Sequence, residues 1–219
     1  MRGRSFSDCC SGYIDFSKAR VPDMDINWSD VNLWVSLATI TFNPLFWNVV
    51  ARWEYRSKAL SNLFRNQRLA CVLLGITIFL LGLFRDLRFK AALDSQPRWY
   101  ALHENWILWS GYSCMAVGAV FVLISYYRLG FFGTFLGDYF GILMDEKVTS
   151  FPFSVLENPM YWGSFLNFVG GALVKASQAG LVLSIWVAVC YKVAIQFEGP
   201  FTAKIYEDRD RKMRFNKMA

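Results

Sequence analysis

The chain has 219 residues, of which 55% are hydrophobic and only 18% are charged. Soluble domains carry roughly 25% charged residues, so this composition argues against a soluble protein. The formal net charge is +6, and the basic residues lie mostly between the apolar stretches and in the C-terminal tail. This pattern argues against nucleic-acid binding and favours anchoring at anionic lipid headgroups.

Residues 1–30 form a polar N-terminal segment that contains five aspartates and lacks the apolar core of a cleavable signal peptide. We expect this segment to be loosely ordered. Residues 31–199 are predicted to form one membrane domain, and residues 200–219 a basic tail on the cytoplasmic side.

Four apolar stretches precede residue 145, and apolar runs of about 18 residues or more are long enough to cross a bilayer. They are Val31–Ala51, Leu69–Phe84, Trp106–Tyr127 and Leu129–Met144. The first contains Asn43-Pro44, which predicts a bend or a segment that only dips into the membrane. The third is the clearest span, and Asp138 interrupts the fourth.

The last apolar stretch, Pro159–Phe197, is too long for one span and is broken near its middle by a polar segment that ends at Gly180. Two antiparallel helices, Pro159–Val174 and Leu181–Phe197, would each cover about 24 Å at 1.5 Å per residue. The alternative is one tilted span with an interfacial extension. Either reading gives an all-α integral membrane protein, a multi-span helical bundle.

Basic residues near the ends of spans indicate sidedness. The tail should be cytoplasmic, and we expect the loop with Arg85, Arg88, Lys90 and Arg98 to share that side. The basic segment of residues 52–68 conflicts with this arrangement if Leu69–Phe84 spans the membrane.

Polar groups at membrane depth cost roughly 2.5–3.5 kcal/mol each, so they are candidates for function. Asp138 is one of them, with either a site role or a helix-packing role at a wet interface. Gly133, Gly137 and Gly141 would lie on one helical face and permit close approach. Gly118, in the third stretch, is read first as a packing residue.

Glu198 ends the last apolar run, and by itself it reads as an ordinary interfacial carboxylate. In the hairpin model it returns to the depth and side of residues 157–163. The free amides at the start of the Pro159 helix then favour an anionic group beside Glu198. His103 is the only histidine, and the five cysteines lack zinc-ligand spacing, so no metal is expected.

Several segments resemble phosphatidylethanolamine N-methyltransferases, and the resemblance covers roughly Ala38 to Tyr206. They are Ile40–Glu54, Gly133–Leu143 (GTFLGDYFGIL), Phe151–Phe153, Asn158–Gly163 (NPMYWG) and Pro200–Ala203. Residues 144–148 and 205–210 look more like the fungal enzymes that prefer the mono- and dimethylated lipids. The segments 148–153 and 158–163 also look, more loosely, like isoprenylcysteine carboxyl methyltransferases, which implies a cofactor site on a membrane helix hairpin.

The resemblance implies that S-adenosylmethionine is the methyl donor, consumed as a co-substrate, and that a membrane phospholipid is the acceptor. The family's Gly-x-Gly and Glu-Glu cofactor motifs fall on Ala116-Val117-Gly118 and Glu198-Gly199, so each motif has lost one member. The expected donor-binding residues are Ala116, Val117, Gly118, Asn158, Pro159, Gly163, Glu198 and Gly199. Glycine at position 199 puts donor affinity, or even activity, in question.

The expected catalytic residues are Asp138, Tyr139 and Tyr161, which would hold the substrate ammonium or relay its proton. Lys147 and Arg128 are candidates for the lipid phosphate. The location implied is the endoplasmic reticulum membrane, and a mitochondrial membrane is a second possibility. Two alternatives remain: the same chemistry on another lipid-like acceptor, such as a prenyl-cysteine carboxylate, and a non-catalytic lipid-binding relative. The oligomeric state is not predicted.

Overall fold

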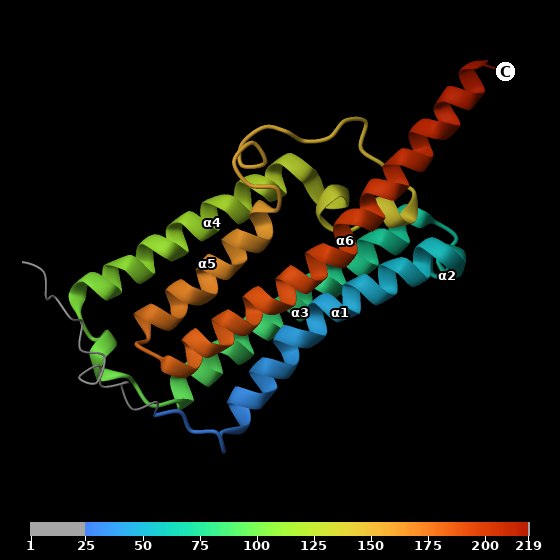
Figure 1. The fold of residues 1–219 in the computed structure, drawn as a ribbon. Coiled ribbons are helices and arrows are strands. Elements are labelled where there is room, and N and C mark those ends of the chain that lie inside the picture. The colour runs from blue at the N-terminus through green and yellow to red at the C-terminus, as the bar shows by residue number, and fades with distance from the viewer. Residues whose placement is uncertain (1–24, 219) are drawn as a thin grey trace, which may run out of the picture.

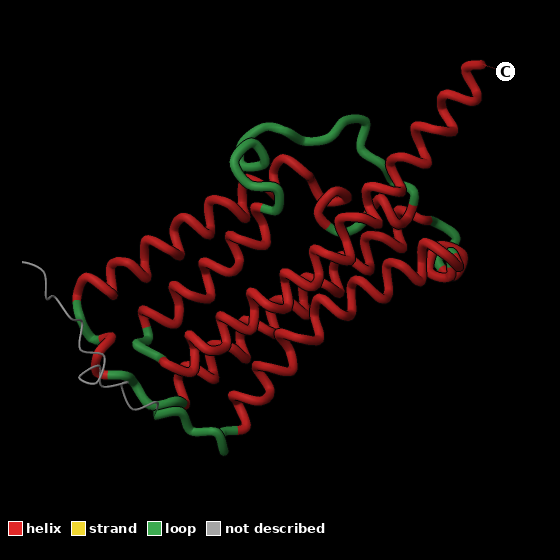
Figure 2. The backbone as a smooth tube through the Cα atoms, viewed as in Figure 1, coloured by secondary structure: helices red, strands yellow, loops and turns green. Residues whose placement is uncertain are grey.

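The computed structural model describes residues 25–218, and within them every regular element is a helix (Figures 1 and 2). Four of the helices are long and apolar enough to cross a membrane. The elements are α1 (Val31–Ser57), α2 (Ala59–Leu63), α3 (Gln67–Ser95), η2 (Tyr100–Leu102), α4 (Asn105–Thr134), η3 (Gly137–Phe140), α5 (Pro159–Val174) and α6 (Gln178–Met218). The predicted all-α membrane bundle is confirmed.

Helix α1 continues through Pro44 and is long and apolar enough to cross a membrane, so the predicted segment that only dips into the membrane is wrong, whereas the predicted bend stays a prediction. The Asn48 side-chain amide donates to the Pro44 carbonyl, inside the turn that follows the proline. The helix starts at Asp30, whose carboxylate accepts from the Asn32 amide as an N-cap. It ends at Lys58, which adopts a left-handed conformation with φ of 54°.

Helix α3 continues well beyond the apolar run that ends at Phe84, because the charged residues of its second half have partners inside the bundle. Arg85 donates to the Tyr191 hydroxyl, and Arg88 donates to the Asn32 side chain. The helix therefore carries the chain to the end of the bundle opposite the tail, where Arg98 pairs with Ser177. Our prediction that Arg85 to Arg98 share the side of the tail is wrong.

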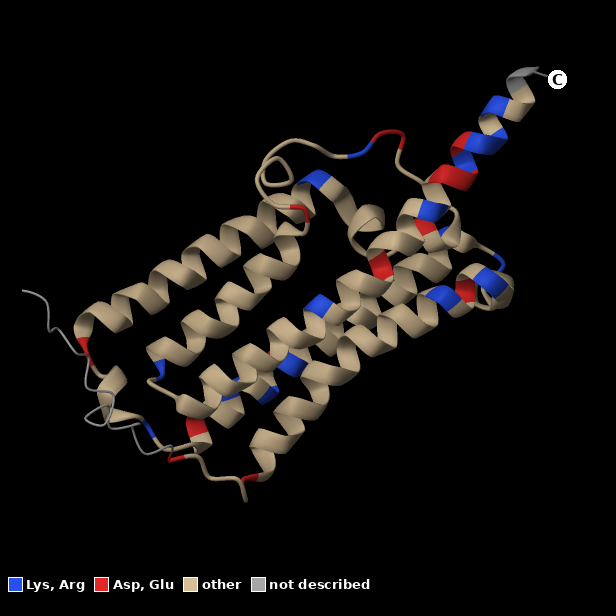
Figure 3. Ribbon diagram, viewed as in Figure 1, with Lys and Arg blue, Asp and Glu red and all other residues tan. Residues whose placement is uncertain are grey.

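This course of α3 removes the conflict over the basic segment of residues 52–68. The end of α1, all of α2 and the start of α3 pack against Tyr139 and Ile205, at the tail end of the bundle. Lysine and arginine gather at that end and along the tail, and further basic positions lie along the long helices of the bundle (Figure 3). The basic segment and the tail share one side.

The predicted fourth stretch is not a membrane span. Gly130 breaks the helical path of α4 with φ of 63° and ψ of −174°, a conformation open essentially to glycine alone. The chain then folds back through the short helix η3, which packs between the ends of α1, α3 and α6. Gly133, Gly137 and Gly141 consequently do not share one helical face, because Gly141 lies beyond η3 with φ of 83°.

The predicted hairpin of the last apolar stretch is confirmed, and the single tilted span is wrong. Helix α5 ends at Val174, and α6 begins at Gln178 after a tight turn in which Ala176 has φ of 49°. Gly180 is not the turn residue: it lies in the first turn of α6, where a Cβ would collide with Leu93 and approach Ala172 Cβ to 2.8 Å. Helix α6 continues past Pro200 to Met218, across the predicted boundary at residue 199.

Helices α4 and α5 pack closely through glycines (Figure 1). A Cβ on Gly118 would lie 2.5 Å from the Gly163 carbonyl oxygen, and a Cβ on Gly170 would lie 2.6 Å from that of Gly111. Small residues at such crossings let two membrane helices approach backbone to backbone. The α4–α5 pair therefore lies beside the other three long helices as a tightly joined unit.

Residues 25–30 close the end of the bundle opposite the tail. Ile26 is buried, and the Asn27 amide donates to the Gln96 side chain. This part of the predicted N-terminal segment is therefore packed, whereas residues 1–24 lie outside the described residues.

Candidate active site

The candidate site lies where α5 begins and α6 passes the tail end of the bundle. The Tyr161 hydroxyl donates to Glu198 Oε2 at 2.6 Å. The hairpin explains this contact, because α5 starts at the level that α6 reaches after running the length of the bundle. Tyr161 also packs edge-on against Tyr191, with ring centroids 5.0 Å apart.

Two cavities meet at this pair. One has a volume of about 400 Å³ and extends into the bundle between α3, α4, α5 and α6. The other has a volume of about 860 Å³ and lies beneath residues 142–149 and the first part of the tail. Glu157, Asn158, Tyr161 and Glu198 line both cavities. The four residues thus stand at the junction of an inner and an outer compartment.

The outer cavity is lined by more acidic than basic side chains. The acidic residues are Asp138, Asp145, Glu146, Glu157, Glu198 and Asp210, and the basic residues are Lys147 and Arg209. Arg209 is already engaged, since it donates to the carbonyl of Met144 and pairs with Asp210. The compartment therefore favours a cationic ligand.

The inner cavity is lined by both apolar and polar side chains from several helices, and most of its exposed surface is apolar. Among the apolar residues are Trp47, Ile78, Val122, Leu136, Phe153 and Met160. Its polar lining is concentrated at the Tyr161–Glu198 junction and, deeper in the bundle, around Arg85 and Tyr191. A compartment of this kind suits an amphipathic molecule with a small polar head.

Asp138 and Tyr139 are adjacent in η3 but have different surroundings. Asp138 lines the outer cavity and accepts from the Thr202 hydroxyl at 3.0 Å. Tyr139 is 1% exposed, lines neither cavity and stacks on Phe201 with ring centroids 5.1 Å apart. Its position is that of a packing residue, whereas Asp138 can reach a ligand.

The residues expected to bind the donor divide into two groups. Asn158, Pro159, Glu198 and Gly199 line at least one of the cavities. Ala116, Val117, Gly118 and Gly163 line neither. Gly118 and Gly163 lie against each other, so they set the distance between α4 and α5.

Gly199 faces the outer cavity with open space around it. A Cβ at this position would meet nothing within 4 Å. The backbone at this position therefore has room for a side chain to begin beside the cavity.

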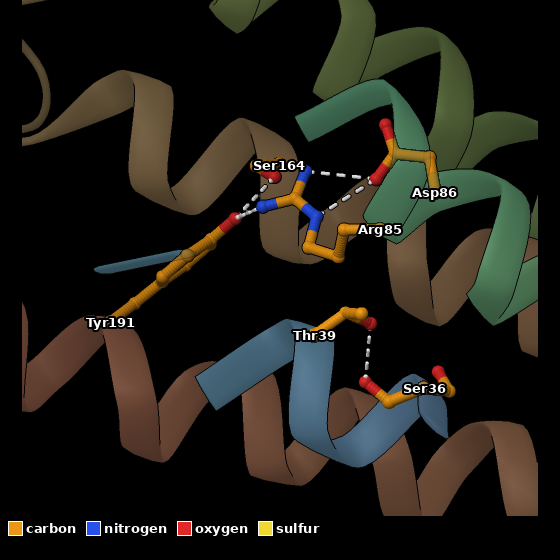
Figure 4. Close-up of polar contacts among 6 residues, drawn as sticks. All are labelled: Ser36, Thr39, Arg85, Asp86, Ser164 and Tyr191. Atoms are coloured by element: carbon orange, nitrogen blue, oxygen red, sulfur yellow. Dashed lines mark hydrogen bonds and ion pairs between the residues drawn. The ribbon is translucent and has the colours of Figure 1, made fainter. Parts of the chain in front are cut away.

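Sequence reasoning missed a polar cluster in the inner cavity (Figure 4). It consists of Arg85 and Asp86 on α3, Ser164 on α5 and Tyr191 on α6. The charged pair Arg85-Asp86 directly after an apolar run was the available signal, and it was read as the start of a loop. Among residues 25–218, no group of three or more His, Cys, Asp or Glu side chains could hold a metal ion.

Comparison with known proteins identifies the family of this chain. The family model described as phospholipid methyltransferase matches residues 106–209. The chain is 55% identical to the phosphatidylethanolamine N-methyltransferase of Rattus norvegicus over 171 residues, 78% of this chain and 86% of that protein.

Relatives whose names give a methylated lipid as the acceptor are nearly as similar to this chain as the Rattus norvegicus protein is. The phosphatidyl-N-methylethanolamine N-methyltransferase of Neurospora crassa is 50% identical over 85% of this chain and 87% of its own length. The protein of that name in Saccharomyces cerevisiae is 49% identical over 81% of this chain and 86% of its own length. No solved structure matches. The chain belongs to the phospholipid methyltransferase family.

Proposed function

We propose that this chain transfers methyl groups from S-adenosylmethionine to the amine of phosphatidylethanolamine, of its mono- and dimethyl derivatives, or of both, and so yields phosphatidylcholine. The observation that carries the proposal is the Tyr161–Glu198 pair at the junction of the two cavities. One compartment suits a dissolved cation and the other an embedded amphiphile. The pair stands where the two substrates meet.

The donor is assigned to the outer cavity. Its sulfonium and ammonium groups are cationic, and the acidic lining attracts both. Its carboxylate can bind at the start of α5, where Asn158 makes no side-chain cap and leaves backbone amides free. Glu198 is the carboxylate best placed to contact the donor, while Gly118 and Gly163 support the site by holding α5 against α4.

Methyl transfer requires a neutral amine in line with the sulfonium carbon. The N–C bond forms as the C–S bond breaks, so the amine must lose a proton and the donor leaves as the neutral thioether. For an amine with the pKa of lysine, deprotonation at pH 7 costs about 4 kcal/mol. The Tyr161–Glu198 pair can accept that proton, and Asp138 can hold the ammonium group before the proton leaves.

Alignment of the two substrates contributes more than proton transfer. Holding two reactants in the correct geometry lowers a barrier by roughly 7–11 kcal/mol. The junction provides this alignment because α5 and α6 fix Tyr161 and Glu198 from neighbouring backbones. We therefore assign to the protein mainly a positioning role.

The tail end is proposed to face the cytosol. Basic residues at the end of α1, on either side of α2, at the start of α3 and in the tail gather there, as the positive-inside rule requires of a cytoplasmic side. The outer cavity then opens toward the compartment that holds the dissolved donor. The membrane proposed is that of the endoplasmic reticulum, with a mitochondrial membrane as a second location.

The test is a labelled-methyl assay with purified full-length protein in mixed micelles. Each of the unmethylated, monomethyl and dimethyl lipids is supplied as the only acceptor. Transfer to one or more of them is expected in wild type, and a loss of at least about 100-fold in Glu198→Gln. Absence of transfer to all three lipids by a wild-type protein that binds the donor would overturn the proposal.

A further inference from the structure

Arg85 is a cation fixed in the middle of the membrane bundle. Its side chain is 11% exposed, yet it lines the inner cavity. A charged residue at such depth is costly to insert, because its charge must leave water. An arginine kept there needs partners, a function, or both.

The structure holds the guanidinium from three helices (Figure 4). Nη1 donates to the Tyr191 hydroxyl at 2.7 Å, and that hydroxyl lies 2.9 Å from the Ser164 hydroxyl. Nε and Nη2 both donate to Asp86 Oδ1, at 2.9 and 2.8 Å. The Phe168 ring lies beneath the group, 5.0 Å from its central carbon.

These contacts orient the guanidinium but leave some of its N–H groups without a hydrogen-bond partner among the residues that the structure describes. They use three of the five N–H groups that arginine carries, so two remain for a ligand in the cavity. The neighbouring anion neutralises the site only in part, because the Asp86 side chain is 55% exposed. Planar paired N–H groups of this kind match phosphate oxygens.

The depth of Arg85 matches the order of groups in a phospholipid. Tyr191, its partner on α6, precedes Glu198 by about two helical turns, or about 10 Å along the axis. In an ethanolamine lipid the amine is outermost and the phosphate lies four bonds deeper, about 5 Å away by ordinary bond lengths. With the amine at the junction, the phosphate is directed toward Arg85.

We propose that Arg85, oriented by Tyr191 and Asp86, binds the phosphodiester of the lipid acceptor and thereby sets its amine at the junction. The proposal rests on the proposed function. An alternative source of the anion is the donor's carboxylate, but Arg85 lines only the inner cavity and not the outer, acidic one. The residues suggested from sequence fit less well: Lys147 lines only the outer cavity, and Arg128 lines neither.

The test compares two acceptors in micelles of an uncharged detergent with full-length protein. One is phosphatidylethanolamine, and the other is its methyl phosphotriester, which keeps the amine but has a neutral phosphate. In wild type the apparent KM for the diester, as a mole fraction, is expected to be about 10-fold lower than for the triester. Arg85→Gln should raise the diester KM by about 10-fold and leave the triester KM and the donor KM within about twofold.

Three further variants separate binding from folding. Asp86→Asn keeps the guanidinium and one acceptor oxygen for it but removes the anion, so it should weaken the preference for the diester by less than Arg85→Gln does. Arg85→Lys keeps a point charge without the planar fork, so it should recover part of the preference. Arg85→Gln combined with Asp86→Asn leaves no unpaired charge, and it should lose the preference while its Tm stays near that of wild type.

Equal changes for diester and triester, or a change in donor KM instead, would overturn the proposal. A binding assay tests the Arg85 proposal independently of the proposed function. Phosphatidylmethanol, a phosphodiester without an amine, should displace a fluorescent lipid from wild type and at least about 10-fold less well from Arg85→Gln. Displacement that depends on Arg85 in a protein that methylates no amine would refute the proposed function alone, and methylation without that dependence would refute the Arg85 site alone.

Discussion

The two ends of the helix bundle contain similar polar residues, but these residues have different surroundings. At the end opposite the tail, polar side chains pair with one another: Lys175 bonds Asp94 at 2.6 Å, and Gln96 bridges Asn27 and Asp30. At the tail end, Glu157, Glu198 and Asp138 face cavities. One end satisfies its polar groups internally and closes the bundle, whereas the other leaves them available to ligands.

This difference shows that polar side chains by themselves do not identify the candidate site. Asp30 and Asp138 both accept hydrogen bonds from side chains, but only Asp138 borders a cavity. What distinguishes the tail end is the fold-back after Gly130, which places η3 between helix ends and leaves space beside it. Substitutions at the two ends should therefore have different effects.

The largest effect is expected for Glu198→Gln. It removes the carboxylate at the junction, so activity should fall by at least about 100-fold and donor affinity measured by calorimetry should fall with it. Glu207→Gln is the matched control, because Glu207 lies on the same helix, is 71% exposed and pairs only with Arg211. Unchanged donor binding in Glu198→Gln would contradict our placement of the donor.

Next in size is Tyr161→Phe, which keeps the ring contact with Tyr191 and removes the hydrogen bond to Glu198. We expect kcat to fall by about 10–100-fold, within the range of general acid–base contributions, while Tm changes little. Tyr139→Phe is the control. Tyr139 lines neither cavity, so this variant should keep most of the wild-type activity. A larger loss in the control would restore Tyr139 as a catalytic residue.

A pair of glycine substitutions sharpens the comparison between the ends. In Gly163→Ala the new Cβ would lie 2.7 Å from the Gly118 carbonyl oxygen, and in Gly170→Ala it would lie 2.6 Å from that of Gly111. Both should lower stability by about 1–3 kcal/mol. Only Gly163→Ala, two residues from Tyr161, should also raise the donor KM, and equal KM values in the two variants would argue against any role of Gly163 in the site.

Gly199→Glu is expected to strengthen donor binding. The side chain enters open space and adds a carboxylate to the outer cavity. An added charge at a solvated site contributes up to about 1 kcal/mol, so donor affinity measured by calorimetry should rise by up to about fivefold. Gly199→Gln has the same shape without the charge, and an equal gain there would show that charge is not the cause.

The smallest effect is a pH dependence at the closed end. Although burial alone would raise it, hydrogen bonds from Ser95, Asn32 and Gln96 hold the pKa of Asp30 below its ordinary value of 3.8. Because the folded-state pKa is depressed, this stabilisation is present above about pH 4 and is lost as the pH falls through the folded value. Asp30→Asn should therefore be slightly less stable than wild type at pH 6, and the difference in thermal unfolding should shrink as the pH falls below about 4. A difference that does not change with pH would assign the effect to the lost side-chain geometry instead of the charge.

Much of the architecture follows from local pattern. The lengths of the apolar runs predict the long helices, and the polar break in residues 175–180 predicts the hairpin, because a bilayer limits how far one span can reach. The same hairpin predicts that Glu198 returns to residues 157–163, which the contact with Tyr161 confirms. Length and polar breaks are sufficient for these features because each belongs to one helix or to one pair of helices joined by a short turn.

Tertiary structure decided the rest. Arg85 looks like the start of a loop until α6 supplies Tyr191, and Tyr139 looks like a site residue until Phe201 and Tyr55 cover it. The side on which each basic segment lies also depended on how far α3 continues beyond its apolar run. The physical reason is that burial and partners come from helices distant in sequence, so a charge at membrane depth and a charge in a loop can look alike in the sequence alone.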